Sequence, residues 1–189
     1  MYIARILYPV KVLGPGKRIG MWFAGCEHKC RGCSNPELWS IQEKYYATIE
    51  QVEILIRSVA AENIIDGFTI TGGDPMEQAS EIADLLEKVK DISEDVMLYT
   101  GYEITELTLD AHKKLLDNVA VLIDGRYDED LNDNSFLRGS SNQTIHILKN
   151  QYSDKYHNYI NNNQNEIQNF MINNEVVSVG IHKKDFKFE

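Results

Sequence analysis

Short apolar runs along the chain predict a set of buried strands. The apolar and aromatic run over 18–25 follows the turn residues of 14–16 and predicts the first strand. The runs over 67–70 and 96–99 predict two more. Residues 119–123 are five apolar residues in a row, which is typical of a strand buried on both faces.

Stretches of helical periodicity separate these strands. Thr48 and Gln51 have the spacing of a capping box, and the apolar residues from 52 to 59 recur at i, i+3, i+4 and i+7. A second helix is predicted with its apolar face over 82–89, and a weaker one over 109–116. The alternation of strand and helix predicts an α/β fold with a mostly parallel sheet, in which the helices form the crossovers.

Unusual motifs follow all four of these strands. In parallel α/β sheets, ligands bind beyond the carboxyl ends of the strands. The motifs are the cysteine loop from Cys26 to Cys33, Gly72-Gly73-Asp74-Pro75, Thr100-Gly101-Tyr102 and Asp124-Gly125. We therefore expect the four motifs to meet at one binding site.

The C-terminal part of the chain has a different composition. Nine of the 25 residues over 150–174 are Asn, and the apolar spacing there supports a helix at most. Further strands are predicted over 144–148 and 176–181. We expect a core over 1–149 and an Asn-rich extension over 150–189 that packs on the core or trails from it.

Composition and charge exclude several classes of protein. The chain has 189 residues, 43% hydrophobic and 25% charged, which suits one soluble domain with its own core. The net charge of −10 disfavours nucleic acid and anionic membranes as partners. No apolar stretch approaches the roughly 20 residues of a membrane helix, and the N-terminus lacks a signal-peptide pattern. We expect a cytoplasmic protein that docks onto another protein.

The three cysteines predict a metal site. Cys26, Cys30 and Cys33 are an odd number, so they cannot form a complete set of internal disulfides. Thiolates suit iron–sulfur clusters and zinc, and three of them would leave one iron of a [4Fe–4S] cluster open to a substrate. The alternatives are a zinc-binding interaction module with His28 or His182 as fourth ligand, a Cys30–Cys33 redox dithiol, and a non-catalytic iron–sulfur electron carrier.

The cysteine loop resembles a known signature. Cys26-x3-Cys30-x2-Cys33 after a first strand is similar to the motif of the radical S-adenosylmethionine (AdoMet) superfamily. The longer pattern, with His28, Gly32, Asn35 and Trp39, resembles the activating proteins of anaerobic (class III) ribonucleotide reductases, although Leu38 stands where Thr is expected. The resemblance covers roughly 14–148 and implies a short, open, partial TIM-like barrel of parallel strands with outer helices. A complete barrel needs about 200 residues or more.

The resemblance also implies roles for residues of the motifs. It places a [4Fe–4S] cluster on the three cysteines and AdoMet beside it. The Gly-Gly-Asp-Pro stretch, in which Asp74 could accept from an ammonium group, would receive the methionine amino group, and a turn that merely ends the strand is the alternative. The residues implied to bind the cofactor are Gly72, Gly73, Asp74, Pro75, Thr100, Asp124 and Arg138. Arg138 would pair with the AdoMet carboxylate or with the partner protein, while Asn142 and Gln143 would touch AdoMet or orient their loop.

The implied function is reductive cleavage of AdoMet to a 5′-deoxyadenosyl radical, which makes a glycyl radical on a large anaerobic ribonucleotide reductase. A one-electron donor such as flavodoxin would reduce the cluster. Another glycyl-radical enzyme, a peptide or a small molecule is the alternative target. Single residues support weaker expectations. His28 is as well suited to a hydrogen bond that supports the cluster ligands as to solvent. Lys17 and Arg18 are expected to be solvated, and contact with an anionic group is the alternative.

Overall fold

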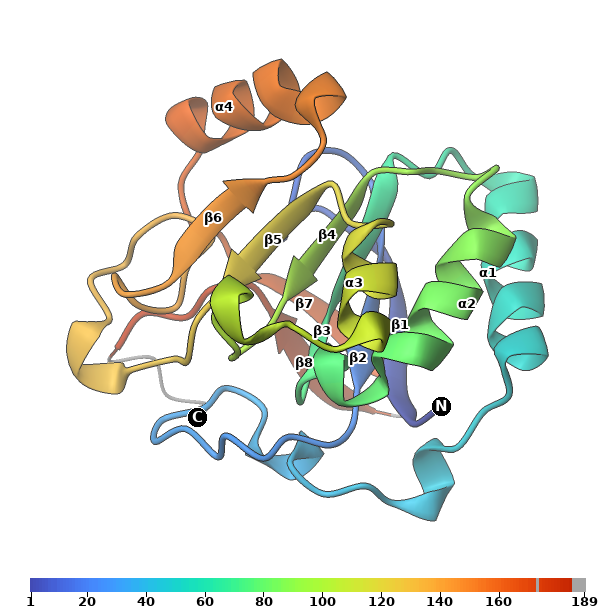
Figure 1. Ribbon diagram of the computed structural model, residues 1–189, viewed down its shortest axis with the longest axis horizontal. Helices are drawn as coiled ribbons and strands as arrows, with labels where there is room; N and C mark the ends of the chain where they lie inside the picture. Colours follow the sequence, from blue (N-terminus) through green and yellow to red (C-terminus); the bar gives the residue numbers. More distant parts are fainter. Residues whose placement is uncertain (173, 185–189) are drawn as a thin grey trace.

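A six-stranded sheet lies at the centre of the computed structural model, which describes residues 1–172 and 174–184 (Figure 1). The strands follow one another across the sheet in chain order: β1 (Ile3–Val10), β2 (Arg18–Phe23), β3 (Gly67–Gly72), β4 (Val96–Tyr99), β5 (Val121–Asp124) and β6 (Thr144–Ile147). The four strands from β2 to β5 are parallel, whereas β1 and β6 run antiparallel to their neighbours. The predicted α/β fold with a mostly parallel sheet is confirmed.

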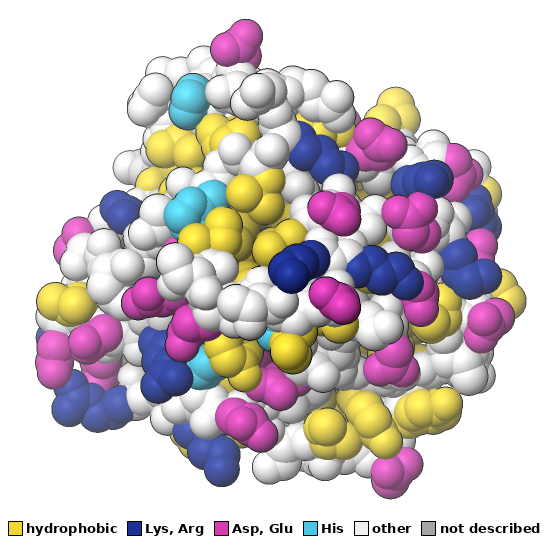
Figure 2. All heavy atoms as spheres, in the orientation of Figure 1, with side chains coloured by type: hydrophobic (Ala, Val, Ile, Leu, Met, Phe, Trp, Pro, Cys, Tyr) yellow, Lys and Arg dark blue, Asp and Glu magenta, His cyan; other side chains and the backbone are white. Residues whose placement is uncertain are grey.

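Three helices connect the parallel strands and cover one face of the sheet (Figure 1). They are α1 (Ile49–Glu62), α2 (Ala79–Val89) and α3 (Asp110–Leu116). Thr48 and Gln51 form the predicted capping box at the start of α1. The buried apolar residues of this face come from both strands and helices, among them Met21, Phe23, Ile70, Leu98, Ile56, Ile82 and Leu86. Acidic and basic side chains are interspersed on the surface that Figure 2 shows over these helices.

The C-terminal part packs against the opposite face of the sheet. Helix α4 (Ser153–Asn162) buries Tyr156 beside Met97 of β4 and Val121 of β5. The hairpin of β7 (Gln168–Ile172) and β8 (Glu175–Val179) is a separate two-stranded sheet. Val179 of this hairpin packs with Trp22 of β2 and with Leu7 and Val10 of β1. Among the described residues, no helix has the length and apolarity needed to cross a membrane.

Several element boundaries differ from those predicted. β1 was not predicted, because six of its eight residues are only partly buried and its Arg5 and Pro9 break the apolar pattern. β5 begins at Val121, although Val119 and Ala120 before it are also buried. β7 falls in the Asn-rich region, where no strand was predicted, and its partner β8 stays outside the main sheet.

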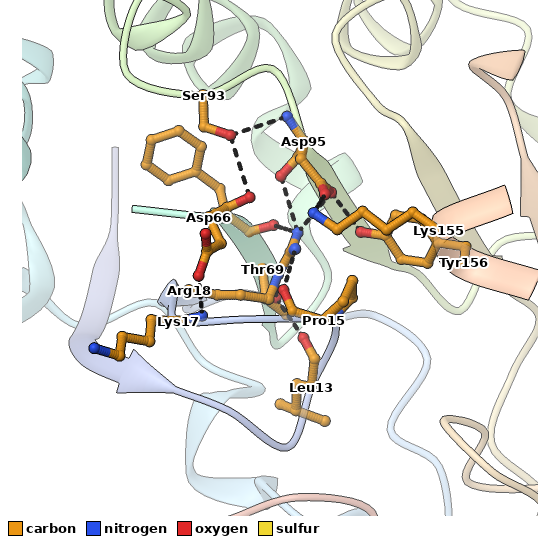
Figure 3. A network of polar contacts seen from close by, with 11 residues as sticks. Leu13, Pro15, Lys17, Arg18, Asp66, Thr69, Ser93, Asp95, Lys155 and Tyr156 are labelled. Atoms are coloured by element: carbon orange, nitrogen blue, oxygen red, sulfur yellow. Dashed lines mark hydrogen bonds and ion pairs between the residues drawn. The ribbon is translucent and has the colours of Figure 1, made fainter. Parts of the chain in front are cut away.

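A buried arginine joins the amino ends of three neighbouring strands (Figure 3). Arg18, at the start of β2, has no exposed surface. Its Nε donates to Thr69 Oγ1 of β3 at 2.8 Å, and its Nη2 lies 3.1 Å from Asp95 Oδ1, just before β4. The same nitrogen donates to the backbone oxygens of Phe68 and Asp95. The expectation that Arg18 is solvated is therefore wrong, and the alternative, contact with an anionic group, is confirmed.

Asp95 also receives two donors from α4, the Lys155 Nζ and the Tyr156 hydroxyl. Burial alone would raise the pKa of the Asp95 carboxyl, but Arg18, Lys155 and Tyr156 together hold that pKa below its usual value. The carboxylate is thus charged and connects the sheet to α4 (Figure 3).

We predict that Arg18→Met lowers the free energy of unfolding by about 3–5 kcal/mol, because it leaves the Asp95 carboxylate buried with fewer partners. Urea denaturation measures this loss. The control is Arg57→Met, which removes the half-exposed pairs with Glu53 and Asp91 and should cost about 1 kcal/mol or less. Equal losses for the two variants would contradict the structural role of Arg18.

The lowered pKa of Asp95 also predicts a dependence of stability on pH. Its contribution is complete above the unfolded pKa of about 3.9 and is lost as the pH falls through the lower folded value. Asp95→Asn should therefore be less stable than the native chain at neutral pH, and its stability should fall less steeply below about pH 4. Urea denaturation of both proteins between neutral pH and about pH 3 tests this prediction, with Asp91→Asn at an exposed residue as control.

Candidate functional site

A cavity of about 650 Å³ lies at the carboxyl ends of the parallel strands. All four motifs that follow these strands contribute to its wall. The residues concerned are Cys26, His28, Cys30, Gly32, Cys33, Gly72, Gly73, Asp74, Thr100, Gly101 and Gly125. The structure therefore brings segments from four separate places in the sequence to a single site.

The cysteine loop leaves β2 and is fixed at its base by backbone hydrogen bonds. The N–H of Gly25 donates to the Leu38 carbonyl at 2.8 Å, and the N–H of Cys26 donates to the Trp39 carbonyl at 3.0 Å. Further along, the N–H of Asn35 donates to Cys33 Sγ at 3.4 Å. All three cysteines are free thiols, each partly exposed, and they line the same cavity.

The chemistry of these thiols suits a cluster with several irons. Burial raises the pKa of Cys26 and of Cys30, and the neighbouring Cys33 raises both further. Such thiols ionise when positively charged metal binds them. Cys26, Cys30 and Cys33 line the same cavity, and their thiolates suit a [4Fe–4S] cluster.

The Gly-Gly-Asp-Pro motif packs directly against the cysteine loop. The N–H of Gly73 donates to the Phe23 carbonyl at 2.7 Å, and the N–H of Asp74 donates to the Gly25 carbonyl at 2.6 Å. A Cβ atom on Gly73 would overlap this carbonyl oxygen of Gly25, so the close approach requires glycine. Pro75 is buried and begins a short 3-10 turn, and it does not reach the cavity wall.

The Asp74 carboxylate is buried and bonded within the chain. Its side chain is 1% exposed and accepts from Thr100 Oγ1 at 2.8 Å, from the N–H of Gly101 at 2.7 Å and from the N–H of Met76 at 3.0 Å. The ring nitrogen Nε2 of His28 lies 3.0 Å from Asp74 Oδ2. An ammonium group of a ligand would have to compete with these four donors.

Two of the residues implied to bind the cofactor have side chains directed elsewhere. Asp124 is buried, accepts from the N–H of Ile104 at 2.7 Å and lies 3.1 Å from His146 Nε2 of β6. Arg138 lines a second, more open cavity of about 660 Å³ beside α4. The structure does not bring either side chain to the main cavity, although Gly125 next to Asp124 lines it.

Hydrogen bonds of Gln143 explain the direction of the loop that carries Arg138. Its Oε1 accepts from the N–H groups of Gly139 and Ser140, and its Nε2 donates to the Gly125 carbonyl at 2.8 Å. Arg138 in turn donates to the Gln143 backbone oxygen at 3.0 Å. Gln143 was expected either to contact AdoMet or to orient its loop, and these hydrogen bonds show that it orients the loop.

Some residues of the cavity wall were not identified as site residues from the sequence. Trp39 Nε1 and Tyr99 Oη are buried donors without a partner among the described residues, and both residues line the cavity. Buried donors of this kind are suited to a ligand with acceptor atoms. Residues 178–184 form another part of the wall. Trp39 belongs to the cysteine motif, and His182 of the C-terminal segment was considered only as a fourth ligand in the zinc alternative.

Comparison with known proteins gives a consistent result. Residues 12–146 match the model of a family described as a 4Fe-4S single cluster domain. The chain is 34% identical over 150 residues to the anaerobic ribonucleoside-triphosphate reductase-activating protein of Escherichia coli (strain K12), covering 75% of this chain and 96% of that protein. The proteins of the same name from Vibrio cholerae and Enterobacteria phage T4 are 36% and 35% identical, over 94% and 90% of their lengths and 74% of this chain. The family resemblance is confirmed.

We predict that Gly73→Ala destabilises the protein by about 1–3 kcal/mol, since the added methyl group must displace the backbone at Gly25. Because that backbone leads into the cysteine loop, iron content after anaerobic reconstitution should fall as well. Thermal unfolding and iron analysis measure the two effects. Ser34→Ala, a small change at an exposed residue of the same cavity wall, is the control. A Gly73→Ala protein with native melting temperature and iron content would refute the close-packing argument.

Proposed function

The chain belongs to the family of anaerobic ribonucleoside-triphosphate reductase-activating proteins, and on this premise we propose that it is a radical AdoMet enzyme that generates a glycyl radical on an anaerobic ribonucleotide reductase. One observation carries the proposal: the three cysteines and the Gly-Gly-Asp turn line the same cavity at the carboxyl ends of parallel strands. Ligands of such sheets bind at this edge.

Cys26, Cys30 and Cys33 would hold a [4Fe–4S] cluster, and AdoMet would bind beside it in the same cavity. When bound, the cluster supplies the electron that cleaves AdoMet to methionine and a 5′-deoxyadenosyl radical, which then removes a hydrogen atom from a glycine of the reductase. The chain's own contribution is to bind and orient the reactants and to exclude water.

The cavity wall beyond the cysteines positions AdoMet. Gly72 and Gly73 present backbone without side chains at the end of β3, so the ligand can approach closely. Trp39 and Tyr99 contribute to the wall around AdoMet, and their donor atoms are buried just behind it without a partner among the described residues. Thr100 acts through Asp74, to which its hydroxyl donates.

Asp124 and Arg138 act outside the cavity in this proposal. Asp124 accepts from the N–H of Ile104 and thereby supports the segment after the Thr-Gly-Tyr motif. For Arg138 we favour contact with the reductase over contact with AdoMet, because it lines the more open second cavity.

We propose further that the sheet is an open, partial barrel. The support is that α1 to α3 cover one face, while Trp22 and Tyr99 on the other face line the cavity. The core would span 1–149 and the extension 150–189, of which 173 and 185–189 lie outside the described residues. An open side would admit the glycine-bearing segment of the reductase.

The remaining parts of the proposal concern the setting of the reaction. A one-electron donor such as flavodoxin reduces the cluster, and the reaction takes place in the cytoplasm. Neither nucleic acid nor a membrane is a partner, in keeping with the net charge of −10.

We predict that the protein, reconstituted anaerobically with iron and sulfide and given dithionite and AdoMet, releases 5′-deoxyadenosine. Chromatography of the products measures it. Cys30→Ala should abolish product formation, because one cluster ligand is lost. A protein that takes up the cluster but never cleaves AdoMet would refute the enzymatic proposal. The electron-carrier alternative would then be favoured.

The target is tested separately by adding the purified anaerobic reductase to the same mixture. Electron paramagnetic resonance (EPR) should detect an organic radical on the reductase, and substitution of the reductase's radical-bearing glycine by alanine should abolish that signal. AdoMet cleavage without a radical on the reductase would indicate another target.

A further inference from the structure

Among the described residues, two side chains of the cysteine loop make ion-pair contacts with other parts of the chain, one exposed and one buried. Arg31 forms ion pairs with Glu129 and Asp130. Its side chain is 70% exposed, so these pairs contribute little to stability. His28 lies between the ligands Cys26 and Cys30, and its side chain is only 4% exposed. Its Nε2 lies 3.0 Å from Asp74 Oδ2. The buried anchor of the loop is therefore His28.

The end of β4 forms a fitted pocket for the His28 ring. The ring meets that of Tyr102 edge to face, with centroids 4.5 Å apart and an interplanar angle of 68°. A Cβ atom on Gly101 would overlap the His28 ring, so the Thr-Gly-Tyr motif carries glycine where the ring passes. The pocket thus fixes the orientation of the ring as well as its hydrogen-bonding nitrogen.

Asp74 connects this anchor to two strand ends. Its oxygens accept from Thr100 and Gly101 after β4, and its own N–H donates to Gly25 at the base of the cysteine loop. The contact of His28 with Asp74 therefore joins the loop that carries the cluster ligands to the turn beside the AdoMet site.

We propose that His28 is a positioning residue, which holds the cysteine loop against the ends of β3 and β4 and so fixes the cluster ligands relative to the Gly-Gly turn. This inference rests on the proposed function, since it concerns ligands of the cluster. Substitution of a residue that orients metal ligands without binding the metal typically lowers metal affinity by about 10–100-fold.

The experiment compares His28→Leu, which removes the hydrogen bond, with His28→Gln, whose amide nitrogen can still donate to Asp74. The control is His112→Leu, the same substitution at a histidine of α3 that contacts Tyr102 from outside the loop. Each protein is reconstituted anaerobically. The rate of cluster loss to an iron chelator and the EPR spectrum of the reduced cluster are then measured, together with the melting temperature of each apoprotein.

We expect His28→Leu to lose its cluster about 10–100-fold faster and to show an altered EPR spectrum. His28→Gln and His112→Leu should behave as the native protein. Two results would overturn the proposal: native cluster retention and spectrum in His28→Leu, or equal loss in His28→Gln and His28→Leu. Reduced retention that merely follows a lower apoprotein melting temperature in all three variants would overturn it as well. If the native chain takes up no cluster, the proposed function itself fails.

Discussion

The buried contact between Arg18 and Asp95 sets the alignment of the central strands, and the site at the opposite edge depends on that alignment. Arg18 reaches from β2 to Thr69 of β3 and to the residue before β4. A buried ion pair is stable only when its remaining hydrogen-bonding groups are satisfied. Here backbone carbonyls, Lys155 and Tyr156 provide those partners. The amino ends of these strands are therefore held in a fixed alignment, and their carboxyl ends line one cavity.

A second buried carboxylate has the corresponding role at the carboxyl edge. Asp74 collects donors from the turn after β3, from the end of β4 and from the cysteine loop. The two networks differ in what they join. Arg18 and Asp95 hold strands and a helix, which are rigid, whereas Asp74 holds loops, which have no regular hydrogen bonds of their own. A site built on loops needs such a support to keep its ligands in place.

The sequence predicted the local features and missed those that depend on distant partners. The cysteine spacing, the Gly-Gly-Asp-Pro turn and the capping box at Thr48 are short-range patterns. Arg18 was expected to be solvated, because its partner Asp95 is 77 residues away and no local pattern reveals it. The direction of Arg138 could not be predicted either. It depends on the left-handed backbone of Leu137, with φ of 61°, and on the hydrogen bonds of Gln143.

The cavity is completed by residues outside the family match. The matching family model covers 12–146, yet residues 178–184 form part of the wall. This segment is held in place, because Val179 is 2% exposed against the sheet and Asn132 donates to the His182 carbonyl at 3.3 Å. The cysteines and glycines of the site thus lie in the matched region, while the C-terminal segment forms another part of the same wall. Part of the cavity wall is therefore formed by a segment that the matched family model does not cover.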